Sequence, residues 1–154
     1  MRARGRERNR MDCETRIICI GNGYIAGDSA GSAVFKELQQ THIPPEIQLI
    51  EGGLAGLNLL PFLEHTKRII FVDNVSGYDE EGAVIVLDEQ EVKAAAGNDQ
   101  YGHDAGLPYV LNVAPQVCEG PPPQTIKLVG IEGIHNEESI RKAAALSLKL
   151  ARGE

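Results

Sequence analysis

Three residues of this chain have side chains that could together hold a metal ion, although they lie far apart in the sequence. Asp28 lies in a glycine-rich loop, GNGYIAGDSAG (21–31), Asp73 ends the apolar run RIIFVD, and His103 precedes another apolar stretch. Two carboxylates and one imidazole form a donor set that suits divalent nickel, manganese, iron or zinc. Three protein ligands would leave positions open for water or a substrate group, as catalytic metal sites require.

The same loop also admits a second kind of chemistry. Residues 27–31 satisfy the G-x-S-x-G pattern of serine hydrolases, and Asp73 followed by His103 or His135 gives the order Ser, Asp, His. That nucleophile needs a sharp turn directly after a strand, whereas about six residues intervene here. Nucleotide binding is disfavoured, because the glycines do not form G-x-G-x-x-G and the loop lacks a P-loop lysine. A serine hydrolase that uses Ser29 with Asp73 and a histidine stays open as the alternative.

Each member of the acid–histidine set also has a purely structural interpretation. Asp28 can be the N-cap of the following helix, although no Glu or Gln stands three positions later to complete a capping box. Asp73 can be a turn residue at a strand end, and His103 an exposed residue at a helix start. The choice depends on whether the fold brings the three side chains together.

Alternating apolar runs and amphipathic segments predict a three-layer α/β/α sandwich around a five-stranded, mostly parallel sheet. The run at 83–88 follows the one at 68–73 after about nine residues, too few for a helical crossover, so this strand should be antiparallel. The predicted strands are 16–20, 46–50, 68–73, 83–88 and 125–131. The predicted helices are 28–41, 56–65, 103–113 and 137–153, and Gly153 is the stop signal of the last one. We predict that 89–102 is irregular or one helical turn and that 118–124 is a loop.

The site of such a fold lies in the crevice at the carboxyl ends of the strands. The segments that should meet there are 21–31, 73–78 and 98–106, which carry the two acids and the histidine. His135 follows the fifth predicted strand closely and is a candidate for supporting a ligand.

The composition is that of one ordinary globular domain, with 42% hydrophobic and 24% charged residues. Five Arg and one Glu give the first ten residues a charge of +4. Since the net charge of the chain is −7, the remaining residues carry −11. We expect residues 1–14 to be a disordered basic leader, or to include residues upstream of a start at Met11, and 15–154 to be a single domain. The acidic body argues against nucleic acid. No apolar run approaches the ~20 residues of a membrane span, and we expect a monomer.

The three cysteines (13, 19 and 118) are odd in number and contain no CxxC pair. This usage suits a reducing cytoplasm and disfavours a disulfide framework or a zinc ribbon. We therefore expect a cytoplasmic protein.

The glycine-rich loop resembles that of the hydrogenase maturation endopeptidases. Members open with a strand and the loop G-N-x-x-x-x-D-[DE]-x-x-G, whose second acid is a nickel ligand. Without gaps, Gly21 and Asn22 take the first pair, Asp28 the ligand position and Gly31 the end. This chain departs from the pattern at the first acid, which is Gly27. A gapped alignment would put Ser29 on the ligand position, but it breaks the match at Gly31.

Further motifs of the family follow in the right order over residues 16–150. They are IEGGLAGLNLLPFLE (50–64) for D-G-G-x-x-G-L-x-L-L, IIFVDNV (69–75) for the strand ending in the second ligand acid, GHDAGLPYVL (102–111) for H-x-x-G-L-x-x-[VL]-L with the third ligand, and KLVGIEG (127–133) for the fifth strand.

The resemblance implies an endopeptidase that removes the C-terminal extension of a nickel–iron hydrogenase large-subunit precursor after nickel insertion. Asp28, Asp73 and His103 would bind nickel that the precursor supplies, and other divalent ions suit the same ligands. The resemblance assigns no catalytic residue. A non-catalytic adaptor for the metallated subunit is a further alternative. Candidates for contacting substrate or supporting the ligands are Gly21, Asn22, Gly31, Gly52, Gly53, Gly106 and His135.

Overall fold

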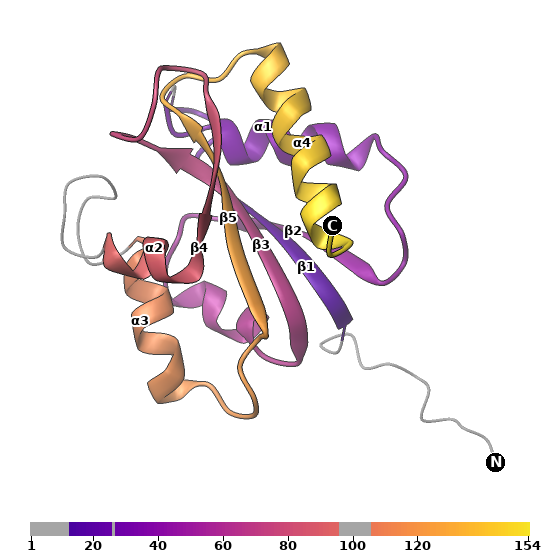
Figure 1. Cartoon of the computed structure of the whole chain (residues 1–154), viewed down its shortest axis with the longest axis vertical. Coiled ribbons are helices and arrows are strands. Elements are labelled where there is room, and N and C mark those ends of the chain that lie inside the picture. The colour runs from indigo at the N-terminus through magenta and orange to yellow at the C-terminus, as the bar shows by residue number, and fades with distance from the viewer. Residues whose placement is uncertain (1–12, 26, 96–105) are drawn as a thin grey trace.

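A five-stranded sheet with helices on both faces forms the body of the protein (Figure 1). The computed structural model describes residues 13–25, 27–95 and 106–154. The arrangement confirms the predicted α/β sandwich. In chain order the elements are β1 (Cys13–Ile20), α1 (Ala30–Gln39), β2 (Ile47–Gly53), the 3-10 helix η2 (Leu57–Leu63), β3 (Thr66–Val75), β4 (Val84–Asp88), α2 (Glu89–Ala94), α3 (Leu107–Val117), β5 (Thr125–Glu132) and α4 (Glu137–Ala151).

The sheet has the order β2-β1-β3-β5-β4. β1 pairs in parallel with β2 and β3, and β3 pairs in parallel with β5. β4 pairs antiparallel with β5, as predicted. The connection from β3 to β4 contains no helix, and without a crossover element a strand cannot return in the parallel direction.

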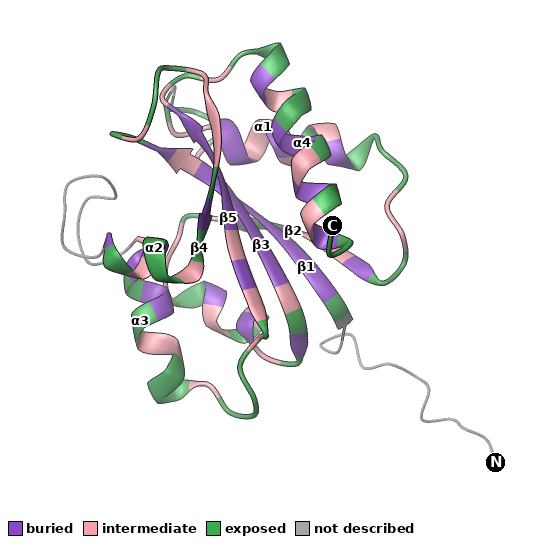
Figure 2. Ribbon diagram, viewed as in Figure 1, coloured by how far each residue is buried: buried purple, intermediate pink, exposed green. Residues whose placement is uncertain are grey.

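The central strands are buried on both faces, which explains their nearly continuous apolar sequences (Figure 2). Successive side chains of a strand point to opposite faces. Ile17 and Ile70 therefore pack with α1 and α4, whereas Ile18 and Phe71 pack with η2, α2 and α3. The helices of both layers thus hold a rigid sheet, whose carboxyl edge carries the candidate loops.

The strand boundaries differ from the prediction by one to three residues, and the differences in β1 and β3 bear on the site. β1 begins at Cys13, two residues inside the segment expected to be a leader. β3 continues to Val75, so Asp73 lies within the strand and not at its end. The extension follows from pairing with β5, in which Val75 stands opposite Glu132 and extends the ladder past the apolar run.

Two helices bear on the prediction. α2 occupies the start of the segment predicted to be irregular or one helical turn and agrees with the second alternative; Asp88 and Glu91 form a reciprocal capping box at its start. α3 ends at Val117, so the predicted end at 113 is wrong; the predicted start at 103 lies outside the described residues. The helix continues past Pro115 because a proline in the last turn removes only one backbone hydrogen bond.

The last helix, α4, matches its sequence signals. Asn136 and Ser139 form a capping box at its start. Gly153 has a φ of +82°, and its N–H donates to the Leu150 carbonyl at 2.9 Å, which confirms the predicted stop. Across the described part of the chain, no helix has the length and apolar character needed to cross a membrane.

Candidate functional site

Asp73 is a buried carboxylate near the carboxyl end of β3, with only 7% of the residue exposed. Its Oδ1 accepts a hydrogen bond from the Asn74 backbone N–H at 2.7 Å. Burial raises the pKa of Asp73 from 3.8 to about 8; the Asn74 N–H acts in the opposite direction, and the charge of Asp28 adds to the rise. Within the described residues Asp73 has no ion-pair partner. A buried acid perturbed in this way is a candidate functional group.

Asp28, the second acid, is half-buried in the loop between β1 and α1. Partial burial raises its pKa, and its charge acts on Asp73. The two acids meet because β1 and β3 are neighbours, with Cys19 opposite Val72 just before their carboxyl ends. The fold therefore brings together two of the three predicted ligands.

Two glycines let the loop fold tightly against the end of β1. A Cβ at Gly31 would lie 1.8 Å from the Ile20 carbonyl oxygen, so only glycine allows α1 to start this close to the strand. A Cβ at Gly21 would lie 2.8 Å from the Asp28 carbonyl oxygen, which also accepts a 2.6 Å hydrogen bond from the Asn22 N–H. These backbone contacts hold Asp28 at the edge of the sheet.

Asn74 joins the three segments around the acids with one side chain. Its Oδ1 accepts a hydrogen bond from the Ala30 N–H at 3.0 Å, at the first residue of α1. Its Nδ2 donates to the carbonyl oxygens of Ile131 at 3.2 Å and Gly133 at 2.6 Å, at the end of β5. Because one acid directly precedes Asn74 and the other lies two residues before Ala30, this amide fixes their relative positions.

The loop after β2 adjoins the loop after β1. The Gly21 N–H donates to the Gly53 carbonyl at 2.9 Å, and Gly53 has a left-handed φ of +65°. A Cβ at Gly52 would lie 2.9 Å from Ile18 Cγ2 and 3.2 Å from Leu59 Cδ2. The glycine pair therefore lets the chain leave β2 closely packed beside the candidate site.

The remaining candidates lie in other positions. His103 is outside the described residues, so its role as a ligand stays a prediction. Gly106 is the N-cap of α3, and its carbonyl oxygen accepts two backbone N–H groups of the first turn. His135 lines a surface hollow with Glu37 and the start of α4; neither acid lines that hollow.

Asn74 and Glu132 also support the site, and their roles were not predicted from the sequence. The buried Glu132 carboxylate accepts hydrogen bonds from the backbone N–H groups of Gly77, Tyr78 and Asp79 at 2.8, 3.0 and 3.2 Å. It thereby anchors the turn between β3 and β4 next to the candidate site. An acid at the end of the apolar run KLVGIE was the available signal, since a buried carboxylate must find donors.

The start of α1 bears on two alternatives. Ser29 is the N-cap, so the alternative interpretation of Asp28 as the helix cap is wrong. Residues 21–28 separate Ser29 from the end of β1, whereas a nucleophile elbow needs a serine at a sharp turn directly off the strand. The loop geometry thus gives no support to a serine nucleophile.

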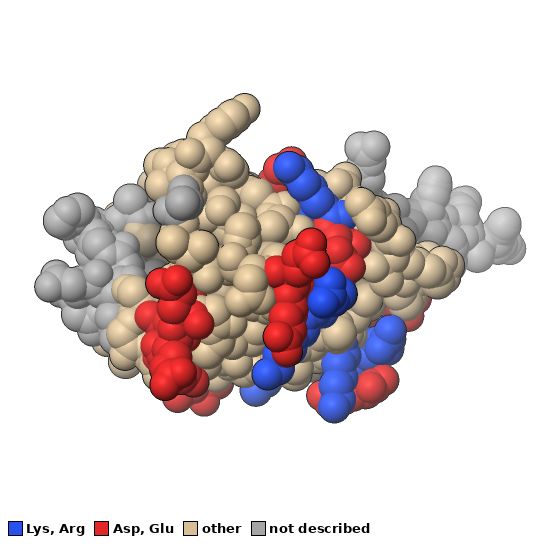
Figure 3. All heavy atoms as spheres, turned by 90° about the horizontal axis from the view of Figure 1, so that it is seen from above, with Lys and Arg blue, Asp and Glu red and all other residues tan. Residues whose placement is uncertain are grey.

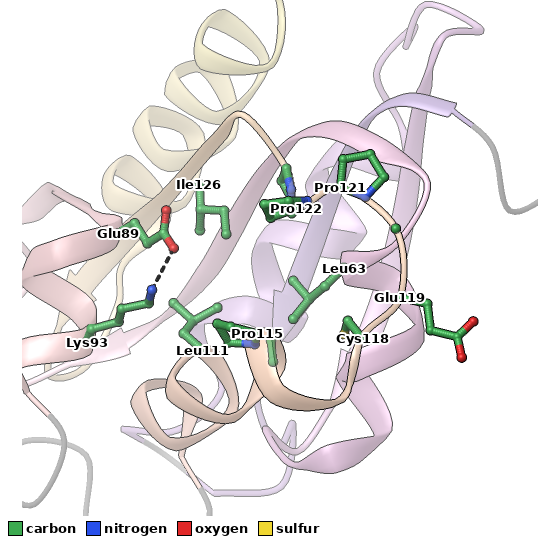
Figure 4. Close-up of a pocket in the computed structure, with 13 residues that line it drawn as sticks. Leu63, Glu89, Lys93, Leu111, Pro115, Cys118, Glu119, Pro121, Pro122 and Ile126 are labelled. Atoms are coloured by element: carbon green, nitrogen blue, oxygen red, sulfur yellow. Dashed lines mark ion pairs between the residues drawn. The ribbon is translucent and has the colours of Figure 1, made fainter.

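A separate cavity of about 260 Å³ lies where α3 ends and β5 begins, far along the strands from the acids (Figure 4). Its walls are largely apolar, and Leu63, Leu111 and Ile126 point into it. The Glu89–Lys93 ion pair, at 3.0 Å, stands at its border. Its charged groups are paired or peripheral, so the acid pair is the better candidate for chemistry.

The chemistry of the acid pair suits a divalent cation. Two carboxylates without a neighbouring cation repel each other, and one of them holds its proton to about pH 8. A bound cation would remove this repulsion and favour the charged forms. The described residues contain no cluster of three or more His, Cys, Asp or Glu side chains that could hold a metal. A third protein ligand for such an ion would have to lie outside the described residues, where the predicted ligand His103 is found in the sequence.

Comparisons with known proteins show which proteins the chain is similar to. The family model described as HycI, hydrogenase maturation protease, matches residues 32–151. The chain is 29% identical over 143 residues to the hydrogenase expression/formation protein HupD of Rhodobacter capsulatus, covering 90% of this chain and 67% of the relative. It is 28% identical over 117 residues to the hydrogenase 2 maturation protease of Escherichia coli, covering 75% of this chain and 70% of the relative.

The fold is similar to solved structures as well. The hydrogenase maturating endopeptidase HybD from E. coli superposes with a TM-score of 0.77 at 24% identity, covering 91% of this chain and 93% of that chain. A likeness at this identity supports the fold, and the family model carries the relationship.

Proposed function

This chain belongs to the hydrogenase maturation protease family, and from that premise we propose that it removes the C-terminal extension of a nickel–iron hydrogenase large-subunit precursor. The cleavage follows nickel insertion, and nickel in the precursor is the element that the enzyme recognises. The observation that carries the proposal is the buried Asp73 carboxylate next to Asp28, because burial and the charge of Asp28 disfavour its charged form, which a cation would favour.

In this mechanism Asp28, Asp73 and His103 complete the coordination of nickel already seated in the precursor. Asp73 gives up its proton as it becomes a ligand, because the cation replaces the proton as the partner of the buried carboxylate. Nickel in this position would polarise the scissile carbonyl or lower the pKa of a bound water. An empty precursor offers no such partner, so the acid pair favours the loaded form over the empty one.

The proposal extends to the setting of the reaction. The enzyme acts in the cytoplasm as a monomer, without nucleic acid and without insertion into a membrane. The odd number of cysteines supports the cytoplasm, and the acidic composition supports the absence of a nucleic-acid partner. An adaptor that binds the subunit without cutting it is disfavoured, because the matched family consists of proteases.

Processing of a nickel-loaded precursor by purified variants tests the ligand set. Asp28→Ala, Asp73→Ala and His103→Ala should each slow removal of the extension by at least about 100-fold, because each removes one ligand from a three-ligand site. Glu46→Ala is the matched control, since it removes an exposed acid just before β2, at the opposite edge of the sheet. The mass of the precursor reports cleavage. Full activity in all three variants would contradict the ligand set.

A further inference from the structure

The loops after β1 and β2 expose an unusual share of apolar surface. Among the described residues, eight large apolar side chains are exposed, and half of them lie in these two loops or at the first residue of η2. Tyr24 is 99% exposed, Leu54 64%, Leu57 54% and Ile25 53%. We call these four residues the apolar rim. Scattered apolar residues on a surface are ordinary, but a concentration beside a candidate site points to a binding surface.

The two loops of the rim adjoin each other at the edge of the sheet. Ile20 at the end of β1 pairs with Gly53 at the end of β2, and the Gly21 N–H donates to the Gly53 carbonyl at 2.9 Å. The rim therefore begins where two hydrogen-bonded strands end. From there the chain after β1 leads to α1 and the chain after β2 leads to η2, on opposite faces of the sheet (Figure 1).

Hydrogen bonds brace the part of the rim that projects furthest. The Tyr24 N–H donates to Asn22 Oδ1 at 2.9 Å, and the Ile25 N–H donates to the Asn22 carbonyl at 3.2 Å. The outward position of both side chains is thus built into the turn. An aromatic side chain on a braced turn loses little conformational freedom on binding, which suits it as an anchor for a partner.

The same turn carries one of the candidate ligands. The Asn22 N–H donates to the Asp28 carbonyl at 2.6 Å, and the Asp28 N–H donates to the Ile25 carbonyl at 3.0 Å. A chain seated on Tyr24 and Ile25 is therefore held next to the acid pair. None of the four rim residues is charged, and the charged side chains on the face seen in Figure 3 stand in separate groups with a broad uncharged area between them.

We propose that the apolar rim is the docking surface for an uncharged, apolar stretch of the precursor polypeptide, next to the part that carries the metal. This inference rests on the proposed function, since continuity with the acid pair identifies the occupant. The rim supplies contacts that are the same before and during cleavage. Its loss should therefore raise KM and leave kcat nearly unchanged.

The double variant Tyr24→Ser/Ile25→Ser tests the rim in processing of nickel-loaded precursor. We expect KM to rise about 10- to 100-fold, because two large apolar side chains lose their contact. The pair Leu54→Ser/Leu57→Ser should act in the same direction. Val117→Ser is the matched control, because Val117 is 56% exposed at the far end of α3. Far-UV circular dichroism and thermal unfolding verify that each variant is folded.

A binding measurement separates this inference from the proposed function. Calorimetry with Asp73→Asn protein and loaded precursor reports docking when cleavage does not occur, and adding the Tyr24 and Ile25 substitutions should weaken that binding. If wild type does not cleave but binding still depends on the rim, docking holds and the proposed function fails. Unchanged KM and unchanged binding overturn the docking proposal. The proposal is also overturned if the wild type self-associates and the rim substitutions make it monomeric without changing KM. The rim would then bind a second copy of this chain.

Discussion

Replacing Asp73 by Asn should make the metal-free protein more stable, and increasingly so as the pH rises. The folded-state pKa of about 8 lies above the ordinary 3.8, so the native state keeps a proton that the unfolded chain releases. The stability associated with this group is therefore fully present below about pH 4 and is lost as the pH rises to about 8. Asn cannot ionise, and it fills nearly the same volume.

The magnitude follows from the difference between the folded-state pKa of about 8 and the ordinary value of 3.8. Each unit corresponds to about 1.4 kcal/mol, so wild type should lose about 1.4 kcal/mol per pH unit relative to Asp73→Asn between pH 5 and 7. The difference should level off above pH 8 at about 6 kcal/mol. This is a large part of the 5–15 kcal/mol that typically stabilises a domain.

Urea unfolding at half-unit pH steps from 5 to 9, with a chelator present, measures this difference. Glu46→Gln is the matched control, because it removes an exposed acid and should give a curve parallel to that of wild type. Parallel curves for wild type and Asp73→Asn would refute the argument, since they would mean that Asp73 ionises equally easily in the folded and unfolded chain.

The loops and side chains around the acids allow three further predictions. Gly31→Ala should destabilise the protein by about 3 kcal/mol or prevent folding, because its Cβ would lie 1.8 Å from a backbone oxygen; urea unfolding should show a much smaller effect for Gly23→Ala, whose Cβ would lie 3.6 Å from the Ser32 side chain. Asn74→Ala should cost about 2–4 kcal/mol by the same assay, because it removes three hydrogen bonds and leaves their buried and half-buried backbone partners without them. A loss below about 0.5 kcal/mol would contradict the bracing role. A fluorophosphonate probe should leave Ser29 unlabelled in a mass-spectrometric assay, whereas labelling there would favour the serine hydrolase.

The sequence was sufficient to locate the strands because the central ones are marked by apolar runs. Residues 69–72 and 128–131 are apolar on both faces, and such runs are typical of buried parallel strands. The direction of β4 followed from the length of its connection. Apolar runs and connection lengths can be read directly from the sequence, so no long-range contact had to be known.

Long-range polar contacts explain most of what was missed. Arg16 is fully buried and donates to the carbonyl oxygens of Phe62 and Glu64 at 2.8 and 2.7 Å and to the Gln48 side chain at 2.9 Å. An arginine at the start of an apolar run would ordinarily be expected at the surface. Its partners are more than thirty residues away in the sequence, and the same separation hid the role of Asn74.

The two proposals assign affinity and discrimination to different groups of the same loop. Apolar contacts at Tyr24 and Ile25 do not sense whether the precursor contains metal, so the rim alone would hold loaded and empty precursors equally well. The buried Asp73 supplies the difference, because without a cation its ionisation is unfavourable and with one its proton is released. It follows that substitutions in the rim should weaken binding of both precursor forms by the same factor, whereas Asp73→Asn should reduce the ratio between them. Measuring both affinities for each variant therefore tests the division directly, because a rim substitution that changed the ratio would show that docking and metal recognition are not separate.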